Sequence, residues 1–294
     1  MSSVKKNFLY NSVYHILLII FPLITAPYIS RVLGANGVGA FSFTHSVANY
    51  FTLFAMLGMK NYGNRCVAMA RDDREDLSRT FWSLYYMQLL TAGLAIIAYL
   101  AFVFLFEQKY ELIALLQTIF VFASLVDISW FFFGMEQFKL TVTRGLLARI
   151  LSIIMIFVFV KTSDDLWKYT LIMVGSTLVT QLAVWPFLRR HVDFVKVTKA
   201  EVLSHIKPNF ILFIPVIAVS LYRVMDKIML GSMVQIAQLG FYANTEKIIN
   251  IPMGLITALG TVMLPRMSNL VVKGDKEASR MYIESSMTFV MFMG

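Results

Sequence analysis

The chain has 294 residues, of which 58% are hydrophobic and only 15% charged, and its mean hydropathy is +0.70. Soluble domains carry roughly 25% charged residues, so this composition excludes a soluble globular protein and indicates a membrane protein. The net charge of +9 would suit nucleic acid only on a soluble basic surface, so we expect no nucleic-acid partner. One cysteine, Cys66, and four scattered histidines exclude a disulfide framework and predict neither a metal site nor a cofactor.

Apolar stretches of about 20 residues, each long enough to cross a bilayer as a helix, follow one another along most of the chain. The first runs uncharged from Asn7 to Ser30, longer than the apolar region of a signal peptide. We predict an all-α, polytopic membrane protein with eight complete spans and the start of a ninth near Ile283. The eight spans are expected at 8–30, 38–59, 81–106, 112–133, 147–163, 169–188, 209–231 and 238–264.

The distribution of Lys and Arg predicts the orientation of these spans, because positive charge resists translocation. In the predicted topology 19 of the 26 basic residues fall on one side of the membrane. This side is therefore the cytoplasm, and it holds the N-terminus and the segments 60–80 and 189–207. The same asymmetry explains the net charge.

An internal repeat with a shift of about 201 residues is visible in the sequence. Lys6 matches Lys207 and Gly39 matches Gly240 at this shift. Each copy begins with a short basic segment that is followed by two spans. Transporter folds are commonly built from such repeats. Because six spans separate the copies, both should have the same orientation, with their symmetry axis along the membrane normal.

The repeat predicts two pseudo-symmetric six-helix lobes, of which the second is truncated. Residues 1–200 form the N-terminal lobe, and residues 201–294 form the start of the C-terminal lobe. The sequence stops at Gly294 within an apolar run. We therefore expect a fragment of a longer protein with about 12 or more spans, inactive in transport by itself.

Several specific strings resemble one family, the polysaccharide biosynthesis or O-antigen flippases of the multidrug, oligosaccharidyl-lipid and polysaccharide exporter superfamily. The resemblance covers nearly the whole chain. It rests on KNFLYN at 6–11, PLITAPYISRVLG at 22–34, DISWFF at 127–132, SDDLWKY at 163–169 and GFY at 240–242.

The resemblance implies a transporter of the bacterial inner membrane rather than an enzyme. Its substrate would be an oligosaccharide linked to undecaprenyl pyrophosphate, moved to the outer leaflet by alternating access for O-antigen, capsule or exopolysaccharide synthesis. Membrane lipids, a polysaccharide polymerase and glycosyltransferases are the implied partners.

Two other functions stay open on the sequence. A drug or metabolite exporter of the same superfamily would have a similar span pattern, although a cation exporter should have a net acidic cavity. A membrane glycosyltransferase or polymerase would need a large polar loop with acid, base or metal ligands. The longest predicted cytoplasmic linkers, 60–80 and 189–207, hold no such cluster.

The seventh and eighth spans carry the main candidates for substrate binding. Arg223, Asp226 and Lys227 are spaced to share one face of a helix, and Glu246 and Lys247 are expected at similar depth. An ionisable group at membrane depth is costly and usually faces a wet cavity or a partner. Arg223, Lys227 or Lys247 could bind the pyrophosphate, or the five groups could form ion pairs at the outer interface.

Asp127 in the fourth span is a candidate for proton exchange if burial raises its pKa. It could equally cap a broken helix or bond to Ser129 or Trp130. Asp226 is a further coupling candidate.

His45 and Glu246 occupy equivalent places in the two repeats and are the remaining coupling candidates. A lone histidine in a membrane helix is more often a hydrogen-bonded packing residue. Arg31 follows the first span and either anchors the interface or lines an outer vestibule that binds substrate. The glycine-rich segment 34–39 is predicted to be the tight turn between the first two spans.

Overall fold

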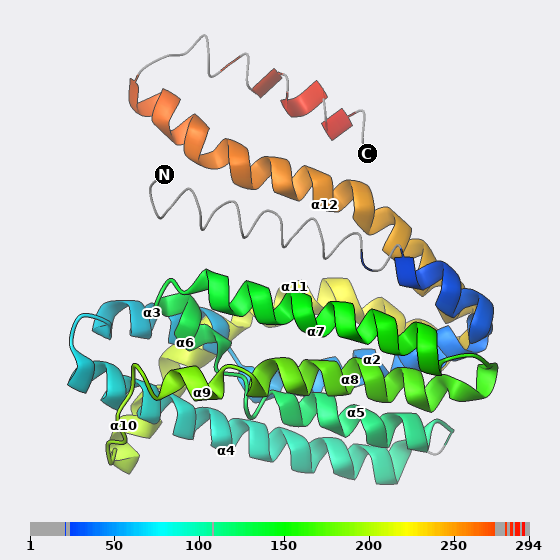
Figure 1. Ribbon diagram of the computed structural model, residues 1–294, viewed down its shortest axis with the longest axis horizontal. Coiled ribbons are helices and arrows are strands. Elements are labelled where there is room, and N and C mark those ends of the chain that lie inside the picture. Colours follow the sequence, from blue (N-terminus) through cyan, green and yellow to red (C-terminus); the bar gives the residue numbers. More distant parts are fainter. Residues whose placement is uncertain are drawn as a thin grey trace. The chain divides into compact units, whose positions relative to one another are not determined.

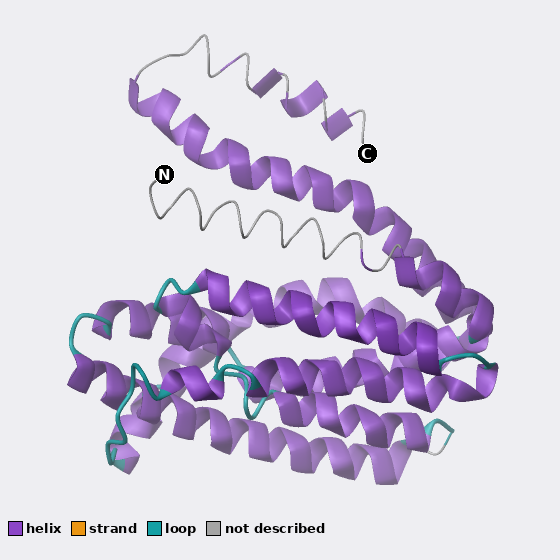
Figure 2. Ribbon diagram, viewed as in Figure 1, coloured by secondary structure: helices purple, strands orange, loops and turns teal. Residues whose placement is uncertain are grey.

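The structure is a computed structural model that describes residues 21, 24–107, 109–273, 280, 283–284, 286–288 and 290–291. Contacts divide the chain into two units, residues 29–243 and residues 1–28 with 244–294, and each is described by itself. All regular structure within the described residues is helical (Figure 1, Figure 2). The all-α prediction is therefore confirmed.

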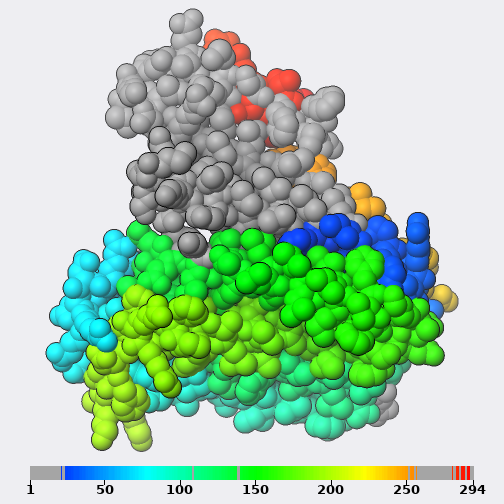
Figure 3. Space-filling view, viewed as in Figure 1, coloured from blue at the N-terminus to red at the C-terminus, as the bar shows by residue number. Residues whose placement is uncertain are grey.

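Long helices form the body of the larger unit and lie along a common direction in Figure 1. α5 packs against α2, α4 and α8, while α7 packs against α8 and α11 against α2. Side chains of α7, α8 and α9, green in Figure 3, fill much of the face in view. The bounds are α2 Gly34–Met56, α4 Arg74–Phe106, α5 Glu111–Ala123, α7 Phe138–Phe159, α8 Leu166–Leu182, α9 Trp185–Leu188 and α11 Ile206–Met233.

Short helices gather at one end of this unit, on the left of Figure 1. α3 is Met59–Ala70, α6 is Ser129–Gly134 and α10 is Lys199–Ser204. A dense aromatic core lies here, in which Phe81 of α4 stacks on Trp130 with ring centroids 5.6 Å apart. Both rings are fully buried, so this end of the unit has a packed core of its own.

Among the residues that the structure describes, four helical stretches are long and apolar enough to cross a membrane: Arg74–Phe106, Leu140–Phe159, Ser163–Leu188 and Lys199–Met233. They confirm several of the predicted spans and make this a multi-pass membrane protein. The total of eight spans and the pseudo-symmetry of two lobes stay predictions, as does a domain boundary near residue 200. Most of the first predicted span and part of the ninth lie outside the described residues.

The fourth predicted span, 112–133, is not one helix. α5 ends at Ala123 and α6 begins at Ser129. Asp127 Oδ1 accepts a hydrogen bond from the backbone N–H of Ser129 at 2.9 Å, which satisfies a donor at the start of α6. The alternative that Asp127 bonds to Ser129 is thus confirmed, while the N-cap of α6 is Ile128, without a side-chain cap bond. The expectation of one helix over 112–133 is wrong.

The carbonyl groups freed by this break need partners, because unpaired backbone groups are costly at membrane depth. Gln88 of α4, which is fully buried, donates from Nε2 to the carbonyl oxygens of Ser124 at 2.7 Å and Asp127 at 2.9 Å. Its Oε1 accepts from Trp130 Nε1 at 2.8 Å. Trp185 Nε1 donates to the carbonyl of Val126 at 2.9 Å. Side chains from other helices therefore satisfy the break.

The glycine-rich segment 34–39 is only partly a turn. The chain turns at Leu33, and Gly34 has a φ of 65°, a left-handed conformation that favours glycine. α2 begins at Gly34, so Gly37 and Gly39 are helical. Their role is in packing rather than in the turn.

α12 runs from Ile236 to Lys273, so it begins in the larger unit and continues in the smaller one. Within the smaller unit, Arg280 Nε and Glu284 Oε1 form an ion pair at 2.8 Å.

Candidate functional site

A polar cavity of about 370 Å³ lies inside the larger unit. Its walls come from α2, α5, α8 and α11 and from the start of α3. Amide, hydroxyl and charged side chains line it in an otherwise apolar bundle: Asn49, Thr52, Lys60, Asn61, Ser124, Asp127, Thr177 and Gln181. The cavity can therefore offer both hydrogen-bond donors and acceptors to a polar ligand.

One cation and one carboxylate are in the cavity wall. Lys60 is exposed, whereas only 6% of Asp127 is exposed. A second cation lies behind the wall, where Arg144 Nη1 donates to Gln181 Oε1 at 3.2 Å and to the carbonyl of Thr180. The lining thus combines charges of both signs. An uncharged polar group of a ligand would find both hydrogen-bond donors and hydrogen-bond acceptors there.

The backbone beside Lys60 is strained. Leu57, between α2 and α3, has a φ of 46°, which is uncommon for a residue with a side chain and costs of the order of 1–3 kcal/mol. The adjacent Gly58 approaches α11 so closely that a Cβ there would lie 2.5 Å from the carbonyl oxygen of Asn209. This junction therefore fixes the position of Lys60 at the cavity.

His45 does not line this cavity. Its Nδ1 forms a hydrogen bond of 3.1 Å with the side-chain amide of the fully buried Gln117. The ring stacks on Phe41 and tilts against Phe120, with centroids 5.3 and 4.6 Å away. This geometry is that of a hydrogen-bonded packing residue, and a coupling role for His45 stays a prediction.

The charged residues of the seventh span lie on α11. Arg223 is exposed, while Asp226 and Lys227 are half-buried. Tyr242 donates from its hydroxyl to Asp226 Oδ2, and Asp226 Oδ1 accepts from the backbone N–H of Lys227 at 2.8 Å. In the part of the chain that the structure describes, no ion pair joins Arg223 to Asp226.

The remaining candidates are described within their own parts of the chain. Glu246 and Lys247 belong to the smaller unit, where Lys247 Nζ donates to Asn244 Oδ1 at 3.3 Å. Arg31 is exposed just before the turn into α2. Their grouping with Arg223 and Lys227 therefore stays a prediction, and only Asp127 among the predicted site residues lines the cavity.

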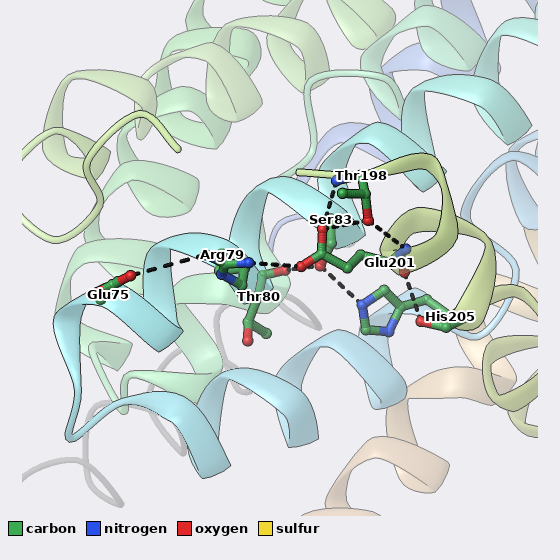
Figure 4. Close-up of polar contacts among 8 residues, drawn as sticks. Glu75, Arg79, Thr80, Ser83, Thr198, Glu201 and His205 are labelled. Atoms are coloured by element: carbon green, nitrogen blue, oxygen red, sulfur yellow. Dashed lines mark hydrogen bonds and ion pairs between the residues drawn. The ribbon is translucent and has the colours of Figure 1, made fainter. Parts of the chain in front are cut away.

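A second polar cluster, which the sequence analysis missed, joins the linker 189–207 to α3 and α4. We call it the polar clasp, and Figure 4 shows its part around Arg79, Ser83, Glu201 and His205. Arg79 Nη1 donates to Glu201 Oε1 at 3.0 Å, and Arg74 makes two hydrogen bonds to Asp193, at 2.6 and 2.8 Å. The members of the polar clasp are Tyr62, Arg74, Arg79, Ser83, Asp193, Glu201 and His205.

His205 is the centre of the clasp because both of its ring nitrogens are engaged. Ser83 Oγ donates its proton to the carbonyl of Thr80 at 3.0 Å, so His205 Nε2–H donates to Ser83 at 2.9 Å. Nδ1 of the neutral ring then accepts from the Tyr62 hydroxyl at 2.8 Å. Burial raises the pKa of Tyr62 to about 12, so this hydroxyl keeps its proton.

One sequence signal could have revealed part of the clasp. Thr198 and Glu201 form a capping box at the start of α10, a pattern that is visible as Thr-x-x-Glu. The partners Arg79 and Ser83 lie more than 110 residues away in the chain, and no local pattern predicts them.

The fold and the polar cavity define a multi-pass membrane protein with a hydrophilic interior site, the arrangement of a transporter. The family model described as polysaccharide biosynthesis protein matches residues 4–271. The chain therefore belongs to the polysaccharide biosynthesis protein family, as its sequence strings indicated.

Two relatives extend this result. A protein of Escherichia coli (strain K12) named "Putative O-antigen transporter" is 25% identical, over 99% of this chain and 71% of its own length. A protein of the same name from Shigella dysenteriae is 21% identical, over 95% of this chain and 70% of its own length. Because both are named as transporters, they agree with the prediction of a non-enzymatic protein. No solved structure gives a significant match.

Proposed function

We propose that this protein moves an oligosaccharide linked to undecaprenyl pyrophosphate across the bacterial inner membrane by alternating access. The product would supply O-antigen, capsule or exopolysaccharide synthesis, with glycosyltransferases before this step and a polymerase after it. The family and the names of the relatives support the transporter role. The positive-inside pattern supports a cytoplasmic N-terminus.

The observation that carries the proposal is the amide-lined cavity. Asn49, Asn61 and Gln181 present amides to it, together with hydroxyl groups and one residue of each charge. Sugars are dense in hydroxyl groups that both donate and accept, and amides match this pattern. We assign the saccharide part of the substrate to this cavity, while the lipid chain stays in the bilayer.

The pyrophosphate is assigned to basic residues outside the cavity. Arg223 is exposed on α11 with Lys227 one turn further on, and guanidinium and ammonium groups bind phosphate oxygens with charge-assisted bonds. Lys247 and Arg31 complete the proposed set. Arg223 forms no ion pair with Asp226 within the described residues, so its charge is available to an anion.

Coupling to an ion is assigned first to Asp127. It is buried, lines the cavity and uses Oδ1 for the backbone of Ser129. Asp226, Glu246 and His45 are the further candidates for this role.

The test replaces cavity amides by an apolar side chain of similar size, Asn49→Leu and Asn61→Leu. Neither side chain has a hydrogen-bond partner in the described part of the chain, so folding should tolerate the change. Each lost bond to a sugar should cost about 0.5–1.5 kcal/mol, or roughly two- to tenfold in export. Surface polysaccharide and membrane abundance are measured with the variants expressed from the chromosomal gene.

The matched control is Asn64→Leu, on the same helix α3 as Asn61 but away from the cavity. Reduced export at normal abundance for the cavity variants, with the control unaffected, supports the assignment. Full export by the Asn49→Leu, Asn61→Leu double variant would contradict it.

A further inference from the structure

Two glycines bring the backbones of α2 and α12 into direct contact. A Cβ built on Gly39 would lie 2.0 Å from the carbonyl oxygen of Ile236, and a Cβ on Gly240 would lie 2.0 Å from the carbonyl oxygen of Ala35. Carbon and oxygen cannot approach so closely, so no side chain fits at either position. We call this contact the glycine crossing.

The glycine crossing is reciprocal. Ala35 and Ile236 are 201 residues apart, as are Gly39 and Gly240, and 201 is also the shift of the sequence repeat. In a two-fold symmetric contact, residue i of one copy touches j of the other while j touches i. The contact therefore has the form expected where two repeated units meet across a pseudo-two-fold axis.

Residues beside the glycine crossing are related by the same shift of 201 residues. Val38 and Leu239, again 201 residues apart, are 3% and 0% exposed beside the crossing. The crossing lies at the first turns of α2 and α12, directly after the chain turns that precede these helices. This is the end of the larger unit opposite α3 and α10 in Figure 1.

From this geometry we infer that the glycine crossing closes the transport pathway at its outer end, and that it must separate for the pathway to open outward. The inference rests on the proposed transport function and on the predicted topology. Helix backbones that touch at glycines make contacts of the Cα–H to carbonyl type, each weak in itself. Such a contact closes the pathway tightly but can separate without leaving strong bonds unpaired.

Alanine in place of either glycine should change the conformation that the protein prefers. An added methyl group clashes only while the crossing is closed, so it should shift the protein toward the outward-open state. The overpacking cost of such a change in a tight contact corresponds to a population shift of about tenfold or more. Gly93 and Gly175 have open space around the position of a Cβ, and they provide matched controls in other membrane helices.

The experiment measures the labelling rate of a buried reporter cysteine in a Cys66→Ser background. Val38→Cys reports on Gly240→Ala, and Leu239→Cys reports on Gly39→Ala. A membrane-impermeant maleimide is applied to spheroplasts and, separately, to inside-out vesicles. We expect labelling in spheroplasts to become about tenfold faster with either alanine, and unchanged with Gly93→Ala or Gly175→Ala.

Three results would overturn the inference. Rates that match the two controls would show that the crossing does not open, and faster labelling only in inside-out vesicles would place it at the inner end. Loss of the Gly39→Ala and Gly240→Ala proteins from the membrane would make the crossing a static packing contact. Because labelling needs no substrate, failure of the proposed function would appear only in the export assay.

Discussion

At the end of the larger unit that holds α3 and α10, side chains make the contacts between elements, whereas at the other end two helix backbones touch directly. Arg74, Arg79 and His205 of the polar clasp each bond to a partner far away in the sequence. Gly39 and Gly240 of the glycine crossing have no side chains, and they meet through their backbones. Opening the clasp would leave several side-chain polar groups without partners, whereas the two glycines offer no such groups.

This difference indicates which end can move. The bonds of His205 to Tyr62 and Ser83 are partly buried, and a lost partner at such a site costs about 1–3 kcal/mol, whereas exposed ion pairs contribute little. The clasp end should act as a fixed base mainly through His205. The first helix after the linker, α11, is tied to that base through His205. The crossing end is then the place where a small change in energy can shift the conformation.

The largest effect is expected at Gln88, which satisfies the break between α5 and α6. Gln88→Leu removes the partners of two carbonyl groups and of Trp130 Nε1 at a fully buried site. Summed over these groups the loss should reach several kcal/mol, enough to deplete the protein from the membrane. Gln235→Leu at an exposed position is the control.

Membrane abundance measured by immunoblot checks this prediction. Normal abundance and an unchanged melting temperature for Gln88→Leu would show that the break does not depend on these bonds. The break between α5 and α6 would then not contribute to the rigidity of the clasp end.

A smaller effect is expected in the clasp itself. His205→Phe removes the bonds to Tyr62 and Ser83, which should destabilise the protein by about 1–3 kcal/mol. Tyr62→Phe removes one of the two bonds and should cost less. Amide hydrogen exchange in α10 should accelerate in the same order, and equal exchange in all three proteins would argue against a clasp.

The smallest effect concerns the ion pair of Arg74 and Asp193, whose side chains are 57% and 62% exposed. The bonds from Arg74 lower the pKa of Asp193. A carboxylate whose pKa is lowered in the folded state stabilises the fold above its ordinary pKa of about 3.9. This contribution is lost as the pH falls through the lowered folded-state pKa.

Asp193→Asn should therefore lower the melting temperature slightly at pH 7, and the difference from the parent protein should vanish in strong acid. The control is Asp72→Asn, at an exposed residue of the turn before α4. If the difference in melting temperature between Asp193→Asn and the parent protein grew as the pH falls, this would contradict the predicted effect of the ion pair.

The sequence predicted the parts of this fold that depend on hydropathy. Apolar runs indicate membrane helices, and the structure has apolar helices over 81–106 and 209–231. Hydropathy along the sequence could not predict that the span 112–133 breaks at Asp127. A break at membrane depth requires partners for its carbonyl groups, and Gln88 lies 36 and 39 residues before the two carbonyls that it serves.

The candidate site shows the same limit. Asp127 stands out in an apolar span and was identified from the sequence, and it does line the cavity. Asn49, Asn61 and Gln181 are uncharged, so the cost of a buried charge, which singles out Asp127, does not identify them. The match of Gly39 with Gly240 was visible as a repeat, but that the two glycines meet follows only from the arrangement of α2 and α12.

The most direct test of the proposed function is transport by the protein purified from the strain that encodes it. Proteoliposomes are loaded with an undecaprenyl-pyrophosphate-linked oligosaccharide, and the fraction cleaved by an added glycosidase is followed with time. The proposal predicts that substrate at first protected from the glycosidase becomes accessible to it when the liposomes contain the parent protein or Asn64→Leu. With the Asn49→Leu, Asn61→Leu double variant this should happen several-fold more slowly. Equal rates in protein-free liposomes and in all three proteoliposome samples would contradict it.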